Sequence, residues 1–416
     1  MKLVSLVLLF LLPAGLARGA DLAELQRMAL ENRQVIQRYE ANLAKSIKGE
    51  AIARGGYYPS LDVSYSMNRL DEAADYEGRE NSVAYGAVSW NLFAGFRDRY
   101  GIESAALLRA VEDYRLRSIR QDIALNVALA YLAIYNRQAN LQVTEDSYNT
   151  LLKLYEDAEN RFKVGLINKS ELLKFKVDLD NAVLTRKKAG AELNKSVLRL
   201  EREIGADASL DQLAFTEFAE LPGVAAYPEL AKVMLAKRSE LKALEEAARI
   251  SALQVRAEQA LYYPRIDLVG SYSRYDDDYL NGNGDNGSEE LRAKLVLSMN
   301  LFDGFVRESR IGQARVEERA ARYDLEELRA ELETGLETLV LDYGVNAENV
   351  SVAAGSIEQA EENLRVTRLS YKEGVGTESE LLDAISSLSR ARFNYVAAKS
   401  AAFGGYFQIT RAVEGF

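Results

Sequence analysis

Two carboxylates one helical turn apart are the side chains best placed for chemistry in this sequence. Glu380 and Asp383 lie three residues apart in a stretch without proline, so a helix there would carry both on one face. Such a pair could act as a general acid and base, or could attract a cation. The chain has no His and no Cys, which removes imidazole chemistry, Ser-His-Asp nucleophiles, His- or Cys-based zinc sites and disulfides. An enzyme is therefore disfavoured, and we predict no cofactor.

A second acidic group lies in the polar segment 276–288. It contains Asp276, Asp277, Asp278 and Asp285, interspersed with Asn and Gly. Several carboxylates in one loop could hold calcium. Asn and Gly are typical of solvent-exposed turns, so we favour a solvated loop and predict no metal site.

The composition predicts long helices rather than ordinary globular domains. Charged residues make up 28 % of the chain, Pro occurs only 5 times, and the net charge of -11 disfavours nucleic acid as a partner. The proline-free stretch from Arg97 to Phe162 could form one helix of roughly 100 Å, at ~1.5 Å per residue. A seam of apolar residues at spacings of three, four or seven indicates a coiled coil: Leu325, Leu328, Leu332, Leu339 and Tyr343.

The sequence contains an internal duplication. Tyr57-Tyr58-Pro59 recurs as Tyr262-Tyr263-Pro264, at an offset of 205 residues. Two further pairs of segments recur at an offset of 209: 89–96 with 298–305, and 161–173 with 370–382. Three matches in the same order at nearly one offset indicate two copies of one structural unit.

The duplication predicts the domain organisation. We expect a first repeat over 20–204, a join over 205–228 that contains two of the prolines, and a second repeat over 229–416. Each repeat has a helix that runs to the Tyr-Tyr-Pro, two strands, a very long helix, a Gly-containing turn and a returning helix.

Apolar and polar residues alternate in four segments of about ten residues. Leu61, Val63, Tyr65 and Met67 alternate with polar side chains, and the segments 266–273 and 291–301 show the same period, whereas 83–93 shows it less regularly. This period suits strands in a wall between lipid and water. An antiparallel sheet with one wet face would show the same alternation.

Four strands cannot close a barrel around a lumen, and lipid tolerates no unpaired strand edges. If these strands lie in a membrane, several copies of the chain must therefore share one barrel.

The N-terminus has the features of a secretory signal. Lys2 precedes an apolar stretch from Leu3 to Leu12, and small residues follow at Ala17 and Gly19. We predict a signal peptide over 1–19, cleaved after Gly19, with Ala17 as the alternative site, so that the mature protein leaves the cytoplasm. No later stretch approaches eighteen consecutive apolar residues, so we expect no transmembrane helix.

Taken together, the motifs make the chain resemble the TolC-like outer-membrane efflux protein family. The segments that carry the resemblance are 57–59, 91–96 with its copy at 300–305, 161–165, and 371–374 followed by 381–384. The family implies an α+β membrane protein whose long antiparallel α-helical coiled-coil barrel is continuous with a trimeric 12-stranded transmembrane β-barrel, four strands per chain. It also implies a homotrimer in the bacterial outer membrane, with the helical barrel in the periplasm. A periplasmic adaptor and an inner-membrane pump would dock to it, for drug efflux or type I protein secretion. The absence of Cys matches the unlipidated branch of the family.

The resemblance also implies functional positions at the tips of the helical hairpins, where the turns contain Gly165, Gly374 and Gly376. Glu380 and Asp383 match the acidic constriction that gates the duct in the family. Glu171 and Tyr371 match a polar link that holds neighbouring hairpins shut.

One position departs from the family pattern. Ser170 matches one side of a second link, but its basic partner would fall at Gly376, which has no side chain to make it. This lock is therefore weaker, or Lys169 or Lys372 supplies the missing cation.

Two rival interpretations remain open. A periplasmic coiled-coil adaptor or scaffold with small β-hairpins would share the helices, and membrane fractionation would distinguish it. An envelope enzyme would have to use paired acids such as Glu380 and Asp383. The transported substrate cannot be predicted, because a passive duct takes its specificity largely from its pump.

Overall fold

The computed structural model describes residues 20–72, 78–277 and 288–416. The predicted signal peptide lies outside the described residues, and so do Asp278 and Asp285 of the acidic loop. Among the described helices, none combines the length and the apolar content that crossing a membrane requires.

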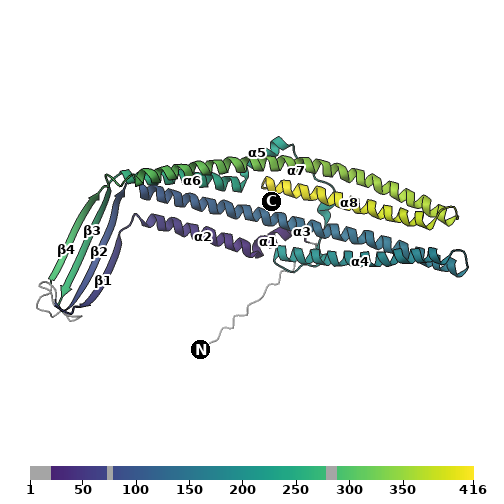
Figure 1. Ribbon diagram of the computed structural model, residues 1–416, viewed down its shortest axis with the longest axis horizontal. Coiled ribbons are helices and arrows are strands. Elements are labelled where there is room, and N and C mark those ends of the chain that lie inside the picture. Colours follow the sequence, from purple (N-terminus) through teal and green to yellow (C-terminus); the bar gives the residue numbers. More distant parts are fainter. Residues whose placement is uncertain (1–19, 73–77, 278–287) are drawn as a thin grey trace, which may run out of the picture. The chain divides into compact units, whose positions relative to one another are not determined.

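The same order of elements occurs twice along the chain (Figure 1). The first set is α1 (Leu22–Asn32), α2 (Gln34–Gly55), β1 (Ser60–Arg69), β2 (Glu80–Ala94), α3 (Arg97–Lys163) and α4 (Lys169–Ile204). The second set is α5 (Tyr227–Lys237), α6 (Ser239–Gln259), β3 (Arg265–Asp276), β4 (Ser288–Ser298), α7 (Val306–Lys372) and α8 (Glu378–Ala412). The predicted helix from Arg97 is confirmed, and α3 and its counterpart α7 each contain 67 residues.

The chain divides into two compact units. The helical unit comprises the described residues up to 37, 118–238 and 331–416, and the strand unit comprises 38–117 and 239–330. Each unit combines segments from both copies of the element order. The compact units therefore cut across the two repeats that the sequence predicts.

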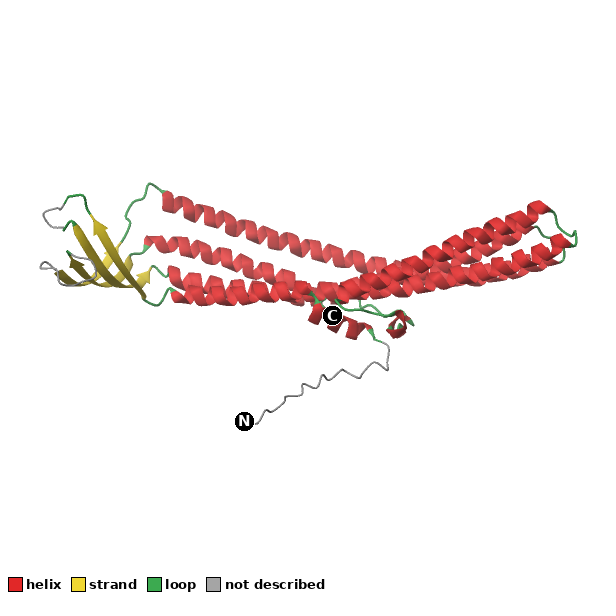
Figure 2. Ribbon diagram, turned by 90° about the horizontal axis from the view of Figure 1, so that it is seen from below, coloured by secondary structure: helices red, strands yellow, loops and turns green. Residues whose placement is uncertain are grey.

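In the strand unit, the four strands form one antiparallel sheet (Figure 2), in the order β1-β2-β3-β4 (Figure 1). β1 and β4 are the edge strands, and their apolar side chains are strongly exposed, as at Val63 (79 %) and Leu291 (84 %). The predicted segment 291–301 is shifted by three residues relative to β4, which spans Ser288–Ser298. Arg265 follows Pro264 at the start of β3 and pairs with Ser298, so the residues after Ser298 have no partner on β3.

Each pair of strands leads into its long helix through a left-handed corner. Gly95 and Phe96 have φ of 64° and 70°, and Gly304 and Phe305 have φ of 71° and 67°. Left-handed backbone is unfavourable for a residue with a Cβ, so each Phe needs compensation from packing. Its ring packs edge-to-face on the Phe three residues earlier, with ring centroids 5.2 Å apart in the first corner and 5.5 Å in the second.

In the helical unit, one apolar cluster holds α3, α4, α7 and α8 together near the turns. Its members are Leu151, Ala158, Phe175, Leu179, Ala182, Tyr371, Leu381 and Ile385. Burial of these side chains from all four helices fixes the two hairpins of the chain against each other.

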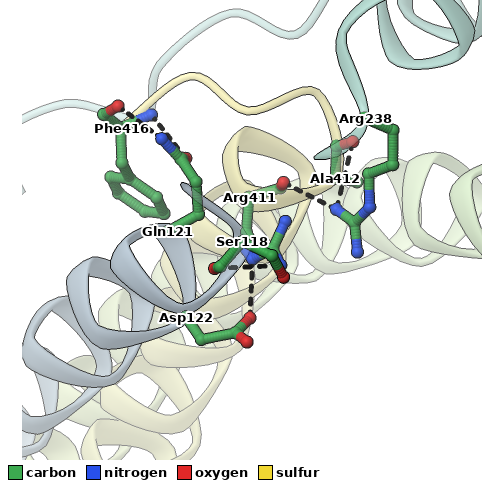
Figure 3. A network of polar contacts seen from close by, with 7 residues as sticks. All are labelled: Ser118, Gln121, Asp122, Arg238, Arg411, Ala412 and Phe416. Carbon is green, nitrogen blue, oxygen red and sulfur yellow. Dashed lines mark hydrogen bonds and ion pairs between the residues drawn. The ribbon is translucent and has the colours of Figure 1, made fainter. Parts of the chain in front are cut away.

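A polar network fastens the end of α8 in the same unit (Figure 3). Arg411, which is 4 % exposed, donates to the Asp122 carboxylate at 2.7 Å and to the Ser118 hydroxyl at 3.2 Å. Arg238 donates to the carbonyls of Arg411 and Ala412, which are among the last carbonyls of α8. The end of a helix leaves such carbonyls without partners inside the helix, so Arg238 acts as a cap.

The two corners provide a matched test of backbone geometry. A Cβ on Gly95 would lie 2.3 Å from the Ala260 carbonyl oxygen, whereas a Cβ on Gly304 would meet nothing within 4 Å. We expect Gly304→Ala to cost only the left-handed strain of ~1–2 kcal/mol. Gly95→Ala should cost a further ~1–3 kcal/mol from overpacking. Thermal unfolding in detergent, followed by circular dichroism, should give the lower apparent Tm for Gly95→Ala. Equal Tm values would contradict the close approach.

Candidate functional site

The two helical hairpins end in turns of the same geometry. In the first, Leu166 N–H donates to the Arg161 carbonyl at 2.9 Å; in the second, Val375 N–H donates to the Ser370 carbonyl at 3.0 Å. Gly165 and Gly374 occupy the left-handed position before each donor, with φ of 78° and 75°. This pattern is the Schellman motif, whose left-handed residue is usually Gly. The repeat in sequence thus gives the same tip twice.

Glu171 and Tyr371 meet across the two hairpins. The Tyr371 hydroxyl, on α7, donates to the Glu171 carboxylate, on α4, at 2.9 Å. The tyrosine is buried, and the Arg161 guanidinium lies 5.3 Å from its ring centroid. Burial, followed by the hydrogen bond to Glu171, raises the pKa of Tyr371 well above its usual value. Tyr371 therefore stays protonated, as a donor, at all ordinary pH values.

A second link between the hairpins is an ion pair that the sequence reading missed. Lys174 on α4 pairs with Glu378 in the first turn of α8. The hydrogen bond between Lys174 and the Glu378 carboxylate is the main reason that the pKa of Glu378 lies below its usual value. A comparison of the two copies of the duplicated sequence could have predicted this contact. At the offset of 209, Lys169 and Lys174 correspond to Glu378 and Asp383, so the two tips carry opposite charges at equivalent positions.

Glu380 and Asp383 lie one turn apart on α8, and both are exposed. Glu380 is part of a capping box: its carboxylate accepts the Thr377 N–H at 2.8 Å, and the Thr377 hydroxyl accepts the Glu380 N–H at 3.3 Å. Asp383 has neither a hydrogen bond nor an ion pair to any residue that the structure describes. The two acids thus differ in how firmly their side chains are held.

Gly376 is tightly enclosed by its own turn. Its N–H donates to the Ser370 carbonyl at 3.0 Å, and an added Cβ would lie 3.1 Å from both the Ser370 Cβ and the Tyr371 nitrogen. A basic side chain at this position would require the turn to shift. Within the described residues, Lys169 and Lys372 form no ion pair, whereas Lys174 pairs with Glu378.

Ser170 lies in an open groove between α4 and α8. The groove is also lined by Lys169, Lys174, Asp178 and Asp383. Its charged side chains come from both hairpins, so it has the mixed polarity of a contact surface rather than that of an enzyme pocket.

The structure places part of the acidic loop at the end of β3. Asp276 is buried, and its carboxylate lies 3.9 Å from the Arg274 guanidinium. Asp277 is also described, whereas the other two acids are not.

Comparisons with known proteins agree with this architecture. The chain matches the outer membrane efflux protein family over residues 25–206 and 230–404. It is 22 % identical to the outer membrane protein TolC of Vibrio cholerae, over 90 % of this chain and 88 % of that protein.

Solved structures share the fold at low sequence identity. A membrane protein from Pseudomonas aeruginosa has a TM-score of 0.83 at 17 % identity, with 94 % of this chain and 93 % of that one covered. The CmeC outer membrane channel of Campylobacter jejuni has a TM-score of 0.81 at 14 % identity, with 95 % and 85 % covered.

These matches confirm the α+β fold and the outer-membrane location that the sequence predicted. They leave the periplasmic adaptor or scaffold without support, since the family profile extends over both repeats. The chain belongs to the outer membrane efflux protein family and is an outer-membrane channel protein.

Proposed function

We propose that three copies of this chain form one channel that serves as a passive exit duct. The observation that carries the proposal is the isolated four-stranded sheet with two open edges. β1 and β4 each expose a row of apolar side chains to their surroundings, and each has an edge without a partner strand among the described residues. In lipid, every backbone group must be paired, so β1 of one copy has to meet β4 of the next. Three sheets of four strands give a twelve-stranded barrel.

The helical units of the three copies would extend into the periplasm as a tunnel. A helix of 67 residues is ~100 Å long at ~1.5 Å per residue, so α3 and α7 would carry the hairpin tips far from the membrane. The two repeats, 20–204 and 229–416, would contribute equivalent hairpins to its wall, with 205–228 as the join between them.

The hairpin tips would gate the duct. Glu380 and Asp383, repeated by the threefold symmetry, would form stacked rings of carboxylates that attract cations and narrow the exit. Asp383 is the freer of the two, because Glu380 is held by its capping box. The Tyr371–Glu171 hydrogen bond and the Lys174–Glu378 ion pair join the two hairpins of each chain, and we propose that they favour the closed state.

The partners would be a periplasmic adaptor and an inner-membrane pump, as the efflux function of the family implies. The open groove at the tips, with charges from both hairpins, is a suitable surface for them. Drug efflux and type I protein secretion both fit such a duct. The neighbouring genes, which show the co-encoded pump and adaptor, would distinguish the two.

Shared strands predict a trimer that resists detergent. Outer-membrane extracts, run on an SDS gel without heating, should show a species about three times the monomer mass that boiling converts to monomer. Backbone hydrogen bonds between the edge strands of neighbouring copies would keep the barrel intact until it is heated. A periplasmic monomer, found in the soluble fraction, would contradict the channel.

Loss of the carboxylate rings should lower cation selectivity. We expect Glu380→Ala with Asp383→Ala to shift the reversal potential in planar bilayers under a salt gradient towards zero. Asp180→Ala with Glu192→Ala removes two other acids of α4, one exposed and one half-buried, and serves as the matched control. Unchanged selectivity in the tip variant would show that these acids do not line the constriction.

Loss of the ion pair should open the tips. Lys174→Met is expected to increase single-channel conductance, because α4 loses its attraction to the start of α8. The charge swap Lys174→Glu with Glu378→Lys restores opposite charges and should return conductance towards that of the original chain. The same conductance in the single variant and the original chain would mean that the pair does not restrain the tips.

A further inference from the structure

A partly open cavity with apolar and polar side chains lies in the helical unit, between α3, α4 and α8. Its volume is about 260 Å³, below the ~300–1,000 Å³ of pockets for drug-sized molecules. The polar side chains that line it without a hydrogen bond among the described residues are Ser147, Asp178, Asn181, Ser386 and Ser389. Asn181 and Ser386 are exposed, so the cavity is open to solvent on one side, and its free polar groups suit a small polar ligand.

Asp178 is the one acid in the cavity lining. Its carboxylate has no hydrogen bond and no ion pair to any described residue, although the side chain is half-buried. The nearby cation Lys174 is already paired with Glu378 on α8. A carboxylate in this state lacks the compensation that buried charges usually have, so a cation would be favoured beside it.

The rest of the lining indicates which kind of cation. The space is far larger than a metal ion, and a single carboxylate is a poor ligand set for a divalent metal. A primary ammonium carries three N–H donors, which match one carboxylate and several hydroxyl acceptors. Leu382, Ile385 and Phe393 line the cavity as well and would cover a short alkyl chain.

We propose that this cavity binds a short aliphatic primary amine in its protonated form, with the ammonium on Asp178 and the hydroxyls of α8. Bound there, the amine would join α4 to α8 within one chain. The cavity is formed within one chain, so the proposal does not rest on the trimer, and Asp383 of the adjoining groove is its neighbour on α8.

Binding should depend on pH through Asp178. Burial, followed by repulsion from Asp383 on α8, raises the pKa of Asp178. Asp383, Lys169 and Lys174 line the adjoining groove beside it. The ammonium pairs only with the ionised carboxylate. Affinity should therefore be full above the raised pKa of Asp178, and should fall as the pH drops through it.

The test uses the purified full-length chain in detergent and n-butylammonium as the probe. Saturation-transfer NMR should show binding with a Kd on the order of 1 mM, as expected for a ligand of five heavy atoms. We expect n-butanol, which has the same alkyl chain without the charge, to bind at least tenfold more weakly. The Asp178→Asn variant should lose at least tenfold in affinity and its pH dependence.

Matched variants separate the site from general effects. Asp180→Asn changes an exposed acid two residues away, which is paired with Lys176, and should bind as the original chain does. Ser386→Leu fills the cavity and leaves Asp178 in place, so it should abolish binding while circular dichroism confirms the fold. Asp383→Asn removes the repulsion and should extend binding to lower pH.

Three results would overturn the proposal. They are the absence of probe binding to the original chain, equal affinity for n-butanol, and undiminished affinity in both Asp178→Asn and Ser386→Leu.

Discussion

The unpaired edges of a four-stranded sheet are the constraint on which the rest of this structure depends. Backbone N–H and C=O groups on β1 and β4 must find partners, and lipid offers none. The exposed apolar side chains on these strands favour lipid, and lipid contains no water that could hydrogen-bond with the backbone. Both needs are met when copies of the chain pair edge to edge. The number of strands in one chain thus makes assembly a condition of membrane insertion.

Duplication supplies that sheet and also the helices that extend from it. Each copy contributes two strands, a left-handed corner and a 67-residue helix. The corners at Gly95 and Gly304 therefore have the same backbone conformation. The copies then diverge in charge. The first tip carries Lys174 where the second carries Asp383, and Lys174 reaches the acid at the start of α8. Divergence between equivalent positions therefore converts two similar hairpins into a complementary pair.

The sequence predicted most of the fold because its signals are local. The absence of proline over long stretches predicted the 67-residue helices, and the alternation of apolar and polar residues predicted all four strands. The end of β4 was wrong by three residues, since it depends on where the partner strand starts beyond Pro264. The capping box of Thr377 and Glu380 could have been predicted from the sequence pattern Thr-x-x-Glu. It restrains one of the two predicted gate acids.

The tip contacts were harder to predict, because they join residues about 200 positions apart. The Lys174–Glu378 pair could have been found only by comparing charges at equivalent positions of the two copies. The need for Gly376 was also hidden, since it arises from the close approach of the Ser370 and Tyr371 backbone within the turn. Such contacts depend on how helices pack, which no local pattern contains.

Strand pairing between copies is the central claim, and engineered cysteines test it most directly. The chain has no Cys of its own, so any disulfide must come from the introduced pair. Ser64→Cys on β1 would be combined in turn with Glu290→Cys, Arg292→Cys and Lys294→Cys on β4. Cα atoms of neighbouring strands lie within the ~4.4–6.8 Å that a disulfide spans only at the correct register. On non-reducing gels of outer membranes, one combination should give a covalent trimer that survives boiling and reverts to monomer with reductant. Monomer alone for every combination, in a chain that still reaches the outer membrane, would contradict the shared barrel.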